Sequence, residues 1–444
     1  MILRKMGEIV WGWPMMGLFL GVGIFFMICL RGFPLRRLGR ALKSIGGKGS
    51  GNGLSPYGAL CTALAATIGT GNIVGVATAV SAGGPGALLW MLLAAVFGMA
   101  TQYAEGYLAV RYRKRTKEGF VGGPFCYMEL GLGKPWMGRI FAFLGASAGL
   151  LGVGTLTQVN SITTAVDRFF PSGTLLGEHT SATVISGAVV LVLSAAVLLG
   201  GAKRISKVCE TLVPLMSVIY LGCALLLLWR YRMEIPSAIS LIVRSALRPR
   251  AVLGAGMGIG LKQAMRMGIG RGVFTNEAGL GTSPIAAAAS NSHDPVAQGL
   301  VTMTGTFIDT ILICTMTGLC LVVTGAWKQP MEGIAITDFA WRRGLPLDER
   351  LSSFLLLLCL VFFAFATIIG WSFYAEQCLR YLTGGRGLQW YRVGYLLAIA
   401  VGPYLTVGAV WELADIFNAL LALPNLTALL LLRREIVEGT RKYS

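Results

Sequence analysis

Charged residues are scarce in this chain, and most of them are basic. Only 13% of the 444 residues are Asp, Glu, Lys or Arg, whereas soluble domains carry about 25%. Hydrophobic residues make up 55% of the chain, and the mean hydropathy is +0.69. This composition excludes an ordinary soluble domain and indicates a chain that lies largely in lipid.

Histidines and paired cysteines are also rare. The two histidines, His179 and His293, lie far apart, and the nine cysteines include no C-x-x-C pair. An ordinary His/Cys metal site and a disulfide framework are therefore not expected. The sequence contains neither a P-loop nor an H-E-x-x-H motif. A polytopic membrane enzyme would need a convergent nucleophile or metal set, and these absences argue against one.

Long hydrophobic runs, in contrast, recur from end to end. A run of about 20 apolar residues can cross about 30 Å of hydrocarbon. We therefore predict an all-α polytopic membrane protein with eleven transmembrane helices, at residues 10–30, 58–80, 86–110, 139–166, 181–200, 208–229, 256–290, 297–325, 352–378, 391–408 and 410–432.

The formal net charge of +18 has two interpretations. In a soluble protein it would suggest nucleic-acid binding. Here the basic residues lie in short connections between spans, where they act as topology determinants. The rule that basic loops remain in the cytoplasm places the N-terminus outside, and it places inside the segments 31–56, 111–138, 201–207, 379–390 and the tail 433–444.

The loop 230–250 does not fit this topology. It carries five arginines, yet alternation of the spans places it outside. Either the rule fails locally, or residues 237–248 form an amphipathic segment in the membrane interface. The sequence leaves both explanations open.

The second span contains an unusual stretch, Ala65-Ala66-Thr67-Ile68-Gly69-Thr70-Gly71-Asn72. Lipid offers no partner for backbone groups, and Gly is a poor helix former, so we expect the helix to break here. The freed groups suit two ligands: amides of Gly69, Thr70 and Gly71 for a carboxylate, and oxygens of Ala65, Thr67, Ile68 and Asn72 for a hard cation such as Na⁺. The alternative is close helix packing through small residues.

The seventh span is interrupted as well. Residues 254–272 contain seven glycines, and residues 275–284 add Asn, Glu, two more glycines and a proline. We expect a second broken helix, in which freed carbonyls of the segment 275–281, including Thr275 and Gly279, receive a substrate ammonium. Asn276 and Glu277 would brace the unwound chain. A re-entrant turn at the membrane edge, with Glu277 in water, is the alternative.

The two interruptions lie five spans apart, and an odd offset reverses the direction of crossing. This pattern predicts two inverted five-helix repeats, 57–250 and 251–432, with binding near the midplane. Residues 1–30 are then an extra N-terminal span, and residues 433–444 are a cytoplasmic tail.

Two further groups are candidates for binding or coupling. In the ninth span, Ala364 and Thr367 share a helix face and could complete a cation site. Trp371, one turn further along, could line the substrate pocket. Ordinary helix packing explains these three residues equally well. Five acids lie within spans and could be proton relays, ion ligands or structural groups: Glu105, Glu210, Asp309, Glu376 and Asp415. Asp309 lies deepest and is the leading candidate for coupling, together with Glu277.

Eight sequence blocks, in order, resemble the alanine/glycine:cation symporters, a family of prokaryotic amino-acid transporters. The blocks are spread over nearly the whole length of the chain: GGPGALLWMLLAAVFG (83–98), GGPFCYM (122–128), KRISKVCETLVPLM (203–216), FIDTILICT (307–315), GWSFYAEQ (370–377), WELADIFNALLALPNL (411–426), and the two interruptions ATIGTGNIVGVATAV (66–80) and GRGVFTNEAGLGTSPIAAA (270–288).

This resemblance implies a fold similar to that of the bacterial leucine transporter. It implies that the amides of Gly69, Thr70 and Gly71 contact a substrate carboxylate, and that Phe274, Asn276 and Trp371 wall a small pocket. It further implies one Na⁺ site at Ala65, Ile68, Ala364 and Thr367, and a second one with Thr67 and Asn72. Such folds often have Ser or Thr where Ile368 stands, so the first site would have one ligand fewer.

The function implied is secondary active transport in a prokaryotic cell (inner) membrane, without a cofactor. The chain would couple Na⁺, or H⁺, to uptake of alanine or glycine by alternating access. A channel or uniporter is the alternative, because the same broken helices could form a filter.

Overall fold

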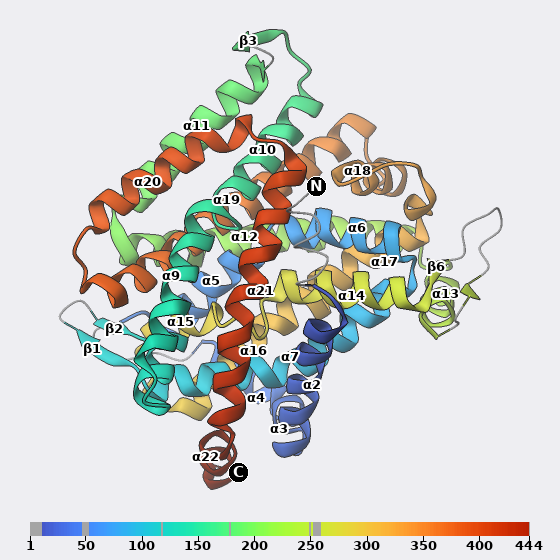
Figure 1. The fold of residues 1–444 in the computed structure, drawn as a ribbon. Helices are drawn as coiled ribbons and strands as arrows, with labels where there is room; N and C mark the ends of the chain where they lie inside the picture. Colours follow the sequence, from blue (N-terminus) through green and yellow to red (C-terminus); the bar gives the residue numbers. More distant parts are fainter. Residues whose placement is uncertain are drawn as a thin grey trace.

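The computed structural model describes residues 11–46, 53–116, 119–176, 179–247, 250–251 and 259–443, which are almost entirely helical (Figure 1). The first half contains α2 (Trp13–Cys29), α3 (Phe33–Arg36), α4 (Leu38–Ser44), α5 (Pro56–Thr67), the π-helix η1 (Gly71–Gly75), α6 (Val76–Gly83), α7 (Gly86–Arg111), α8 (Pro124–Cys126), the π-helix η2 (Tyr127–Gly131), α9 (Pro135–Leu151), α10 (Leu156–Phe169), α11 (Ser181–Leu198), α12 (Gly201–Arg230) and α13 (Ile235–Leu247). The second half contains α14 (Leu261–Asn276), α15 (Ser283–Ala289), α16 (Pro295–Thr306), the π-helix η3 (Phe307–Cys314), α17 (Thr315–Val323), η4 (Ala326–Lys328), α18 (Ile334–Gly344), α19 (Glu349–Thr383), α20 (Leu388–Val401), η5 (Gly402–Tyr404), α21 (Val407–Leu431) and α22 (Arg433–Tyr443).

Seven helices in the described part of the chain are long and apolar enough to cross a membrane, and the bent pair α5 and η1–α6 makes eight. The segments predicted as spans are all helical, with shifted ends, although residue 10 of the span 10–30 and residues 256–258 of the span 256–290 lie outside the described residues. The total of eleven spans and the inverted repeat remain predictions.

Three short antiparallel hairpins interrupt the helical pattern that the sequence predicts. They are β1 (Lys114–Thr116) with β2 (Gly119–Val121), β3 (Thr174–Leu176) with β4 (His179–Thr180), and β5 (Arg250–Ala251) with β6 (Ile259–Gly260). All three lie in connections between helices, where the chain must reverse direction. They leave the fold class helical.

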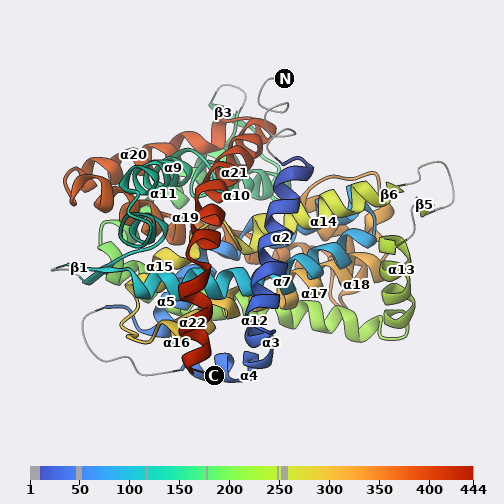
Figure 2. The ribbon, with the colours of Figure 1, turned by 60° about the horizontal axis from the view of Figure 1, so that its bottom comes forward.

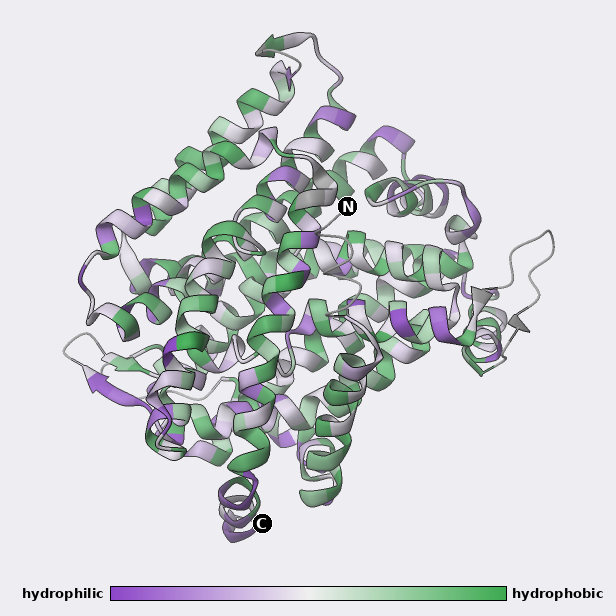
Figure 3. Cartoon of the chain, in the orientation of Figure 1, coloured by the Kyte–Doolittle hydropathy of each residue, from purple (hydrophilic) through white to green (hydrophobic). Residues whose placement is uncertain are grey.

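The long helices differ in how much of their surface other helices cover. Helices α7 and α19 are buried over most of their length, whereas α11 presents a row of exposed apolar side chains: Ile185, Val189, Val192 and Leu193. Helix α20 lies beside α11 at the edge of the molecule (Figures 1 and 2). Coloured by hydropathy, both are largely hydrophobic, whereas hydrophilic residues gather in β1 and α22 (Figure 3). Exposed apolar helices of this kind are suited to contact with lipid.

Both predicted interruptions are present. Helix α5 ends at Thr67, and the chain resumes after a bend of 52° at Gly71. Helix α14 ends at Asn276, and α15 begins at Ser283. A further interruption, which the sequence analysis did not predict, separates α9 from α10 between Leu151 and Leu156, inside the expected span 139–166.

Two terminal or connecting segments form helices that pack onto the rest of the molecule, and the first of them overlaps the amphipathic segment 237–248 that the sequence analysis left open. Residues 235–247 form α13, whose buried face, including Ala238, Ile242 and Ala246, packs against α7. The expected tail forms α22, which buries Ile436 and Thr440, and the Thr440 hydroxyl lies 2.8 Å from that of Tyr103. The C-terminal helix is therefore packed onto α7 (Figure 2).

Candidate functional site

The first interruption is closed by a side chain from its own turn. Ile68 leaves the helix with an extended backbone (φ −76°, ψ 93°). The backbone N–H of Gly69 then donates to the side-chain oxygen Oδ1 of Asn72 over 2.9 Å. The backbone N–H of Asn72 donates in turn to the Gly69 carbonyl over 3.2 Å. In this conformation a carboxylate can reach the Gly69 amide only by displacing the Asn72 side chain.

Asn72 also joins the interruption to the buried acid Asp309. Asn72 Nδ2 donates to Asp309 Oδ1 over 2.7 Å, and the Thr310 hydroxyl donates to Asp309 Oδ2 over 2.7 Å. Asn72 lies in η1 and Asp309 in η3, so two π-helical segments meet at this contact. Such segments are frequent at functional sites. Asn72, Thr310 and Thr275, the side chains that hydrogen-bond to this carboxylate in the described part of the chain, are all neutral.

The two broken helices touch each other at Gly71. A methyl group added at Gly71 would lie 2.8 Å from Thr275 Cγ2. Nearby, Asn276 Nδ2 donates to the Thr310 hydroxyl over 3.1 Å. Thr310 thus connects Asp309 with the end of α14, and Asn72, Thr275, Asn276 and Asp309 form one buried cluster.

The second interruption is a loop with a left-handed backbone. Glu277, Gly279 and Gly281 have φ values of 56°, 93° and 81°. Only glycine adopts such angles without strain, which explains the two glycines. The Asn276 side chain accepts from the Ala278 amide over 3.0 Å, and the Thr282 hydroxyl donates to Glu277 Oε2.

Trp371 of α19 lies against this second interruption. Its indole Nε1 donates to Glu277 Oε1 over 3.0 Å, and both residues are buried. On the other side, the break between α9 and α10 makes room for it, because a methyl group at Gly154 would lie 2.7 Å from Trp371 Cβ. The unpredicted third break therefore accommodates the tryptophan.

Two of the predicted cation ligands come together. The Thr367 hydroxyl lies 3.4 Å from the Ile68 carbonyl oxygen, and Ala364 is buried one turn earlier on α19. Ala65 lies beside α19, since a methyl group at Gly370 would lie 3.0 Å from its carbonyl carbon. Both threonine hydroxyls also donate back into their own helices, that of Thr367 to the Phe363 carbonyl over 3.1 Å and that of Thr67 to the carbonyls of Ala63 and Leu64.

Gly279 lies apart from the residues around Gly71. A methyl group there would contact Phe19 and Leu426 at 2.9 Å, and its carbonyl accepts from Asn425 Nδ2 over 2.9 Å. Gly279 thus faces α2 and α21, on the outer side of the second interruption.

Three further polar residues brace the interruptions: Glu105, one of the five acids that the sequence analysis considered, and Gln158 and Gln102, which it did not predict. Gln158 Oε1 accepts from the Thr70 hydroxyl over 3.2 Å. Glu105 Oε1 accepts from the Gly281 amide over 3.1 Å and from Asn425 Nδ2 over 2.6 Å. Gln102 Nε2 donates to the Asn276 carbonyl over 3.0 Å. The sequence does offer a signal for such residues: polar side chains within apolar spans are costly and usually have a structural or functional role.

A cavity of about 730 Å³ approaches the first interruption. Val74 and Gly75 of η1 line it, so it reaches the turn that follows Asn72, which is itself buried. At its edge the Arg271 guanidinium lies 5.6 Å from the ring centres of both Phe274 and Trp411, and 3.6 Å from Asp415 Oδ1. Phe274, the neighbour of the buried Thr275, thus lies against Arg271 at the edge of the cavity.

Comparison with known proteins shows the family to which this chain is similar. The whole chain, residues 1–444, matches the family model described as the sodium:alanine symporter family. An uncharacterized transporter of Haemophilus influenzae is 45% identical over all of this chain and 95% of its own length. The sodium/alanine symporter AgcS of Methanococcus maripaludis is 40% identical over all of this chain and 97% of its own length.

Among solved structures, a mutant of the Eremococcus coleocola manganese transporter aligns with 89% of this chain and 81% of its own, at 14% identity and a TM-score of 0.46. That likeness is too remote to inform the site. The match over the full length and the two close relatives are decisive: the chain belongs to the sodium:alanine symporter family, a family of membrane transporters and not of enzymes.

Proposed function

We propose that this protein uses an inward gradient of Na⁺, or H⁺, to drive uptake of alanine or glycine across a prokaryotic cell membrane. Membership of the family supports cation-coupled amino-acid symport in general. The observation that carries the specific proposal is the contact of the two interrupted helices, where Gly71 meets Thr275 and Asn72 meets Asp309. In secondary transporters, discontinuous helices that meet inside the membrane usually form the binding sites for substrate and ion.

The cation is proposed to lie between α5 and α19. Oxygen ligands of a hard cation lie about 2.4 Å from it, so two ligands at a right angle are roughly 3.4 Å apart. The Thr367 hydroxyl and the Ile68 carbonyl have this spacing, at 3.4 Å. The carbonyls of Ala65 and Ala364 would complete the site, and Ile368 supplies no further side-chain oxygen. A second cation would use Asn72 together with Thr67.

The amino acid is proposed to lie between the two interruptions. The amides of Thr70 and Gly71 would bind its carboxylate, joined by that of Gly69 when Asn72 gives way. The polar end of α14, with Thr275, Asn276 and the chain beyond it, would receive the ammonium. Phe274 and Trp371 are bulky, so the remaining space suits a small side chain such as that of alanine or glycine.

Transport would follow from movement of two inverted repeats, residues 57–250 and 251–432, around this fixed site. The 730 Å³ cavity would then be one access route, with Phe274 and Arg271 between it and the substrate. In the topology proposed, the N-terminus is outside and α22 is cytoplasmic. Asp309 and Glu277 are the acids proposed to assist coupling, and the oligomeric state is left open.

The test is uptake of labelled alanine into proteoliposomes under defined ion gradients. Accumulation above equilibrium should require an inward Na⁺ gradient or an inward H⁺ gradient, and it should collapse when that gradient is dissipated. Uptake that never exceeds equilibrium, or that does not saturate, would instead indicate a uniporter or a channel.

A further inference from the structure

A second cavity, distant from the interruptions, lies where the ends of several helices meet. Its volume is about 610 Å³, within the roughly 300–1,000 Å³ typical of small-molecule sites. It is formed by the β1–β2 hairpin, η2, the start of α9, and the connection between α19 and α20. We call it the hairpin pocket. Transport through the two interruptions gives it no role.

The hairpin pocket is lined by an excess of positive charge. Lys114, Arg139 and Arg380 line it together with one acid, Glu129, so the lining carries a net formal charge of +2. The three basic residues come from three different elements, β1, α9 and α19. Converging cations from separate elements are suited to an anion that several groups can contact at once.

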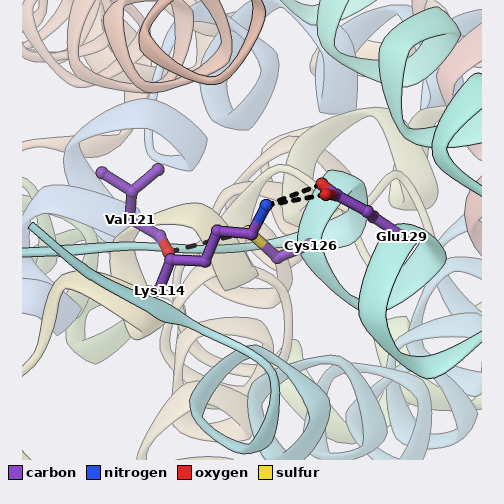
Figure 4. A network of polar contacts seen from close by, with 4 residues as sticks. All are labelled: Lys114, Val121, Cys126 and Glu129. Carbon is purple, nitrogen blue, oxygen red and sulfur yellow. Dashed lines mark hydrogen bonds and ion pairs between the residues drawn. The ribbon is translucent and has the colours of Figure 1, made fainter. Parts of the chain in front are cut away.

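Glu129 already neutralises one of these cations. Lys114 Nζ lies 2.8 Å from both carboxylate oxygens of Glu129, as Figure 4 shows, and Cys126 Sγ reaches the Val121 carbonyl at 3.7 Å beside them. Lys114 also lies 5.6 Å from the ring centre of Tyr381. The pair is partly open to solvent, with 40% and 28% of the two side chains exposed. An incoming anion would therefore compete with Glu129 for Lys114.

The position of the hairpin pocket indicates which anion it takes. Trp136, next to the lining residue Pro135, is 59% exposed, and Trp390 near Leu388 is 81% exposed. Exposed tryptophans of this kind concentrate at the headgroup level of a bilayer. The lining also includes the apolar residues Val121 and Leu382. Basic pockets between membrane helices with such a rim bind the headgroups of anionic lipids.

We infer that the hairpin pocket binds the phosphate headgroup of an anionic phospholipid, held between Lys114, Arg139 and Arg380. The same chemistry could bind free phosphate, but the tryptophans and the apolar lining favour the lipid. A bound headgroup would tie the hairpin to the end of α19, the helix that carries Thr367 and Trp371. The inference does not depend on which amino acid or ion is transported.

The test measures binding to the purified full-length protein by the rise in its thermal unfolding temperature. The probes are short-chain phosphatidylglycerol, short-chain phosphatidylcholine and inorganic phosphate, at matched ionic strength. Phosphatidylglycerol should stabilise the protein, phosphatidylcholine should not, and phosphate should act only at much higher concentration. Equal potency of phosphate and phosphatidylglycerol would overturn the assignment to a lipid.

Two variants should move the affinity in opposite directions. Arg139→Gln, at an exposed position, should weaken the apparent affinity for phosphatidylglycerol by roughly fivefold, the contribution expected of one basic residue near an anionic lipid surface. Glu129→Gln should strengthen it, because Lys114 is released. Lys207→Gln, an exposed basic residue of α12 that does not line the hairpin pocket, should leave it unchanged. Equal affinities in all four proteins would refute the site, and loss of stability in one variant leaves the other as a test.

Discussion

Asn72 and Asp309 are 237 residues apart in the chain, yet Asn72 Nδ2 donates to Asp309 Oδ1 over 2.7 Å in the buried centre of the molecule. This contact connects the first interruption, through Asn72, to η3. The side-chain oxygen of Asn72, Oδ1, accepts from the Gly69 amide over 2.9 Å. One side chain therefore links a backbone amide proposed to bind substrate with an acid proposed to assist coupling.

The negative charge of Asp309 should favour cation binding nearby. Asp309→Asn keeps the shape of the side chain but removes the charge, and the half-saturating Na⁺ concentration for alanine uptake should rise on the order of tenfold. The exposed acid Glu234 offers a control, and Glu234→Gln should behave as wild type. Unchanged Na⁺ dependence in Asp309→Asn would show that the charge of Asp309 does not assist cation binding.

Thr367 should matter more for the cation than for the amino acid. Its hydroxyl lies 3.4 Å from the Ile68 carbonyl. Thr367→Ala should weaken apparent Na⁺ affinity by about tenfold, the loss expected when a group that contacts a charge is removed. Thr367→Ser should retain it. Selectivity between alanine and larger amino acids should change little in either variant, and a selectivity change in Thr367→Ala with intact Na⁺ dependence would contradict the proposed role.

The close contact between the broken helices can be tested by adding a methyl group at Gly71. Gly71→Ala would place a methyl group 2.8 Å from Thr275 Cγ2, and overpacking of this kind typically costs about 1–3 kcal/mol. Transport should fall at least about tenfold. Thr275→Ser removes Cγ2, so adding it to Gly71→Ala should restore part of the activity.

Gly75 provides a matched control for that experiment. It lies in the same π-helix, and a methyl group there would meet nothing within 4 Å. Gly75→Ala should therefore transport nearly as well as wild type. Equal loss in Gly71→Ala and Gly75→Ala, without rescue by Thr275→Ser, would show that close approach to Thr275 is not the reason.

The β1–β2 hairpin should loosen in acid. Burial alone would raise the pKa of Glu129, but hydrogen bonds from Lys114 and Tyr381 and the charge of Arg139 outweigh it and hold that pKa below its ordinary value. A carboxyl group whose pKa is lowered by folding stabilises the folded state fully at pH values above its unfolded pKa, which for Glu is about 4.3. This stabilisation is lost as the pH falls through the lowered pKa of the folded state.

Hydrogen exchange of the strand residues 114–116 and 119–121 can measure this effect. In wild type, protection should be constant near neutral pH and should fall once the pH drops below about 4. In Glu129→Gln, protection should be lower at neutral pH and should show no such transition. The same transition in both proteins would place its origin in another group.

The sequence predicted the two interruptions because their cause is local. Glycines and polar residues inside an apolar span weaken a helix wherever it lies, and the structure breaks both helices at the expected positions. The pairing of Thr367 with the carbonyl of Ile68 followed from a family resemblance, and the structure brings these two residues together.

Other features depend on contacts that no local pattern encodes. The Asn72 side chain could have faced a ligand, and only the packed structure shows that it holds Gly69 and Asp309. The π-helical turn around Asp309 has no simple sequence signature. The break between α9 and α10 contains Gly154, which lies against Trp371, more than 200 residues away in the chain, and inspection of the fourth span alone could not predict this contact.

The central claim is that the cation and the amino acid bind together at one buried site between the two interrupted helices. Calorimetric titration of the purified protein with alanine, in Na⁺ and in a large organic cation at equal ionic strength, tests it most directly. Binding should be tighter by at least about tenfold in Na⁺, and alanine should tighten Na⁺ binding by the same factor, because coupling between two sites is reciprocal. The same alanine affinity in both salts, with H⁺ also without effect, would contradict the account.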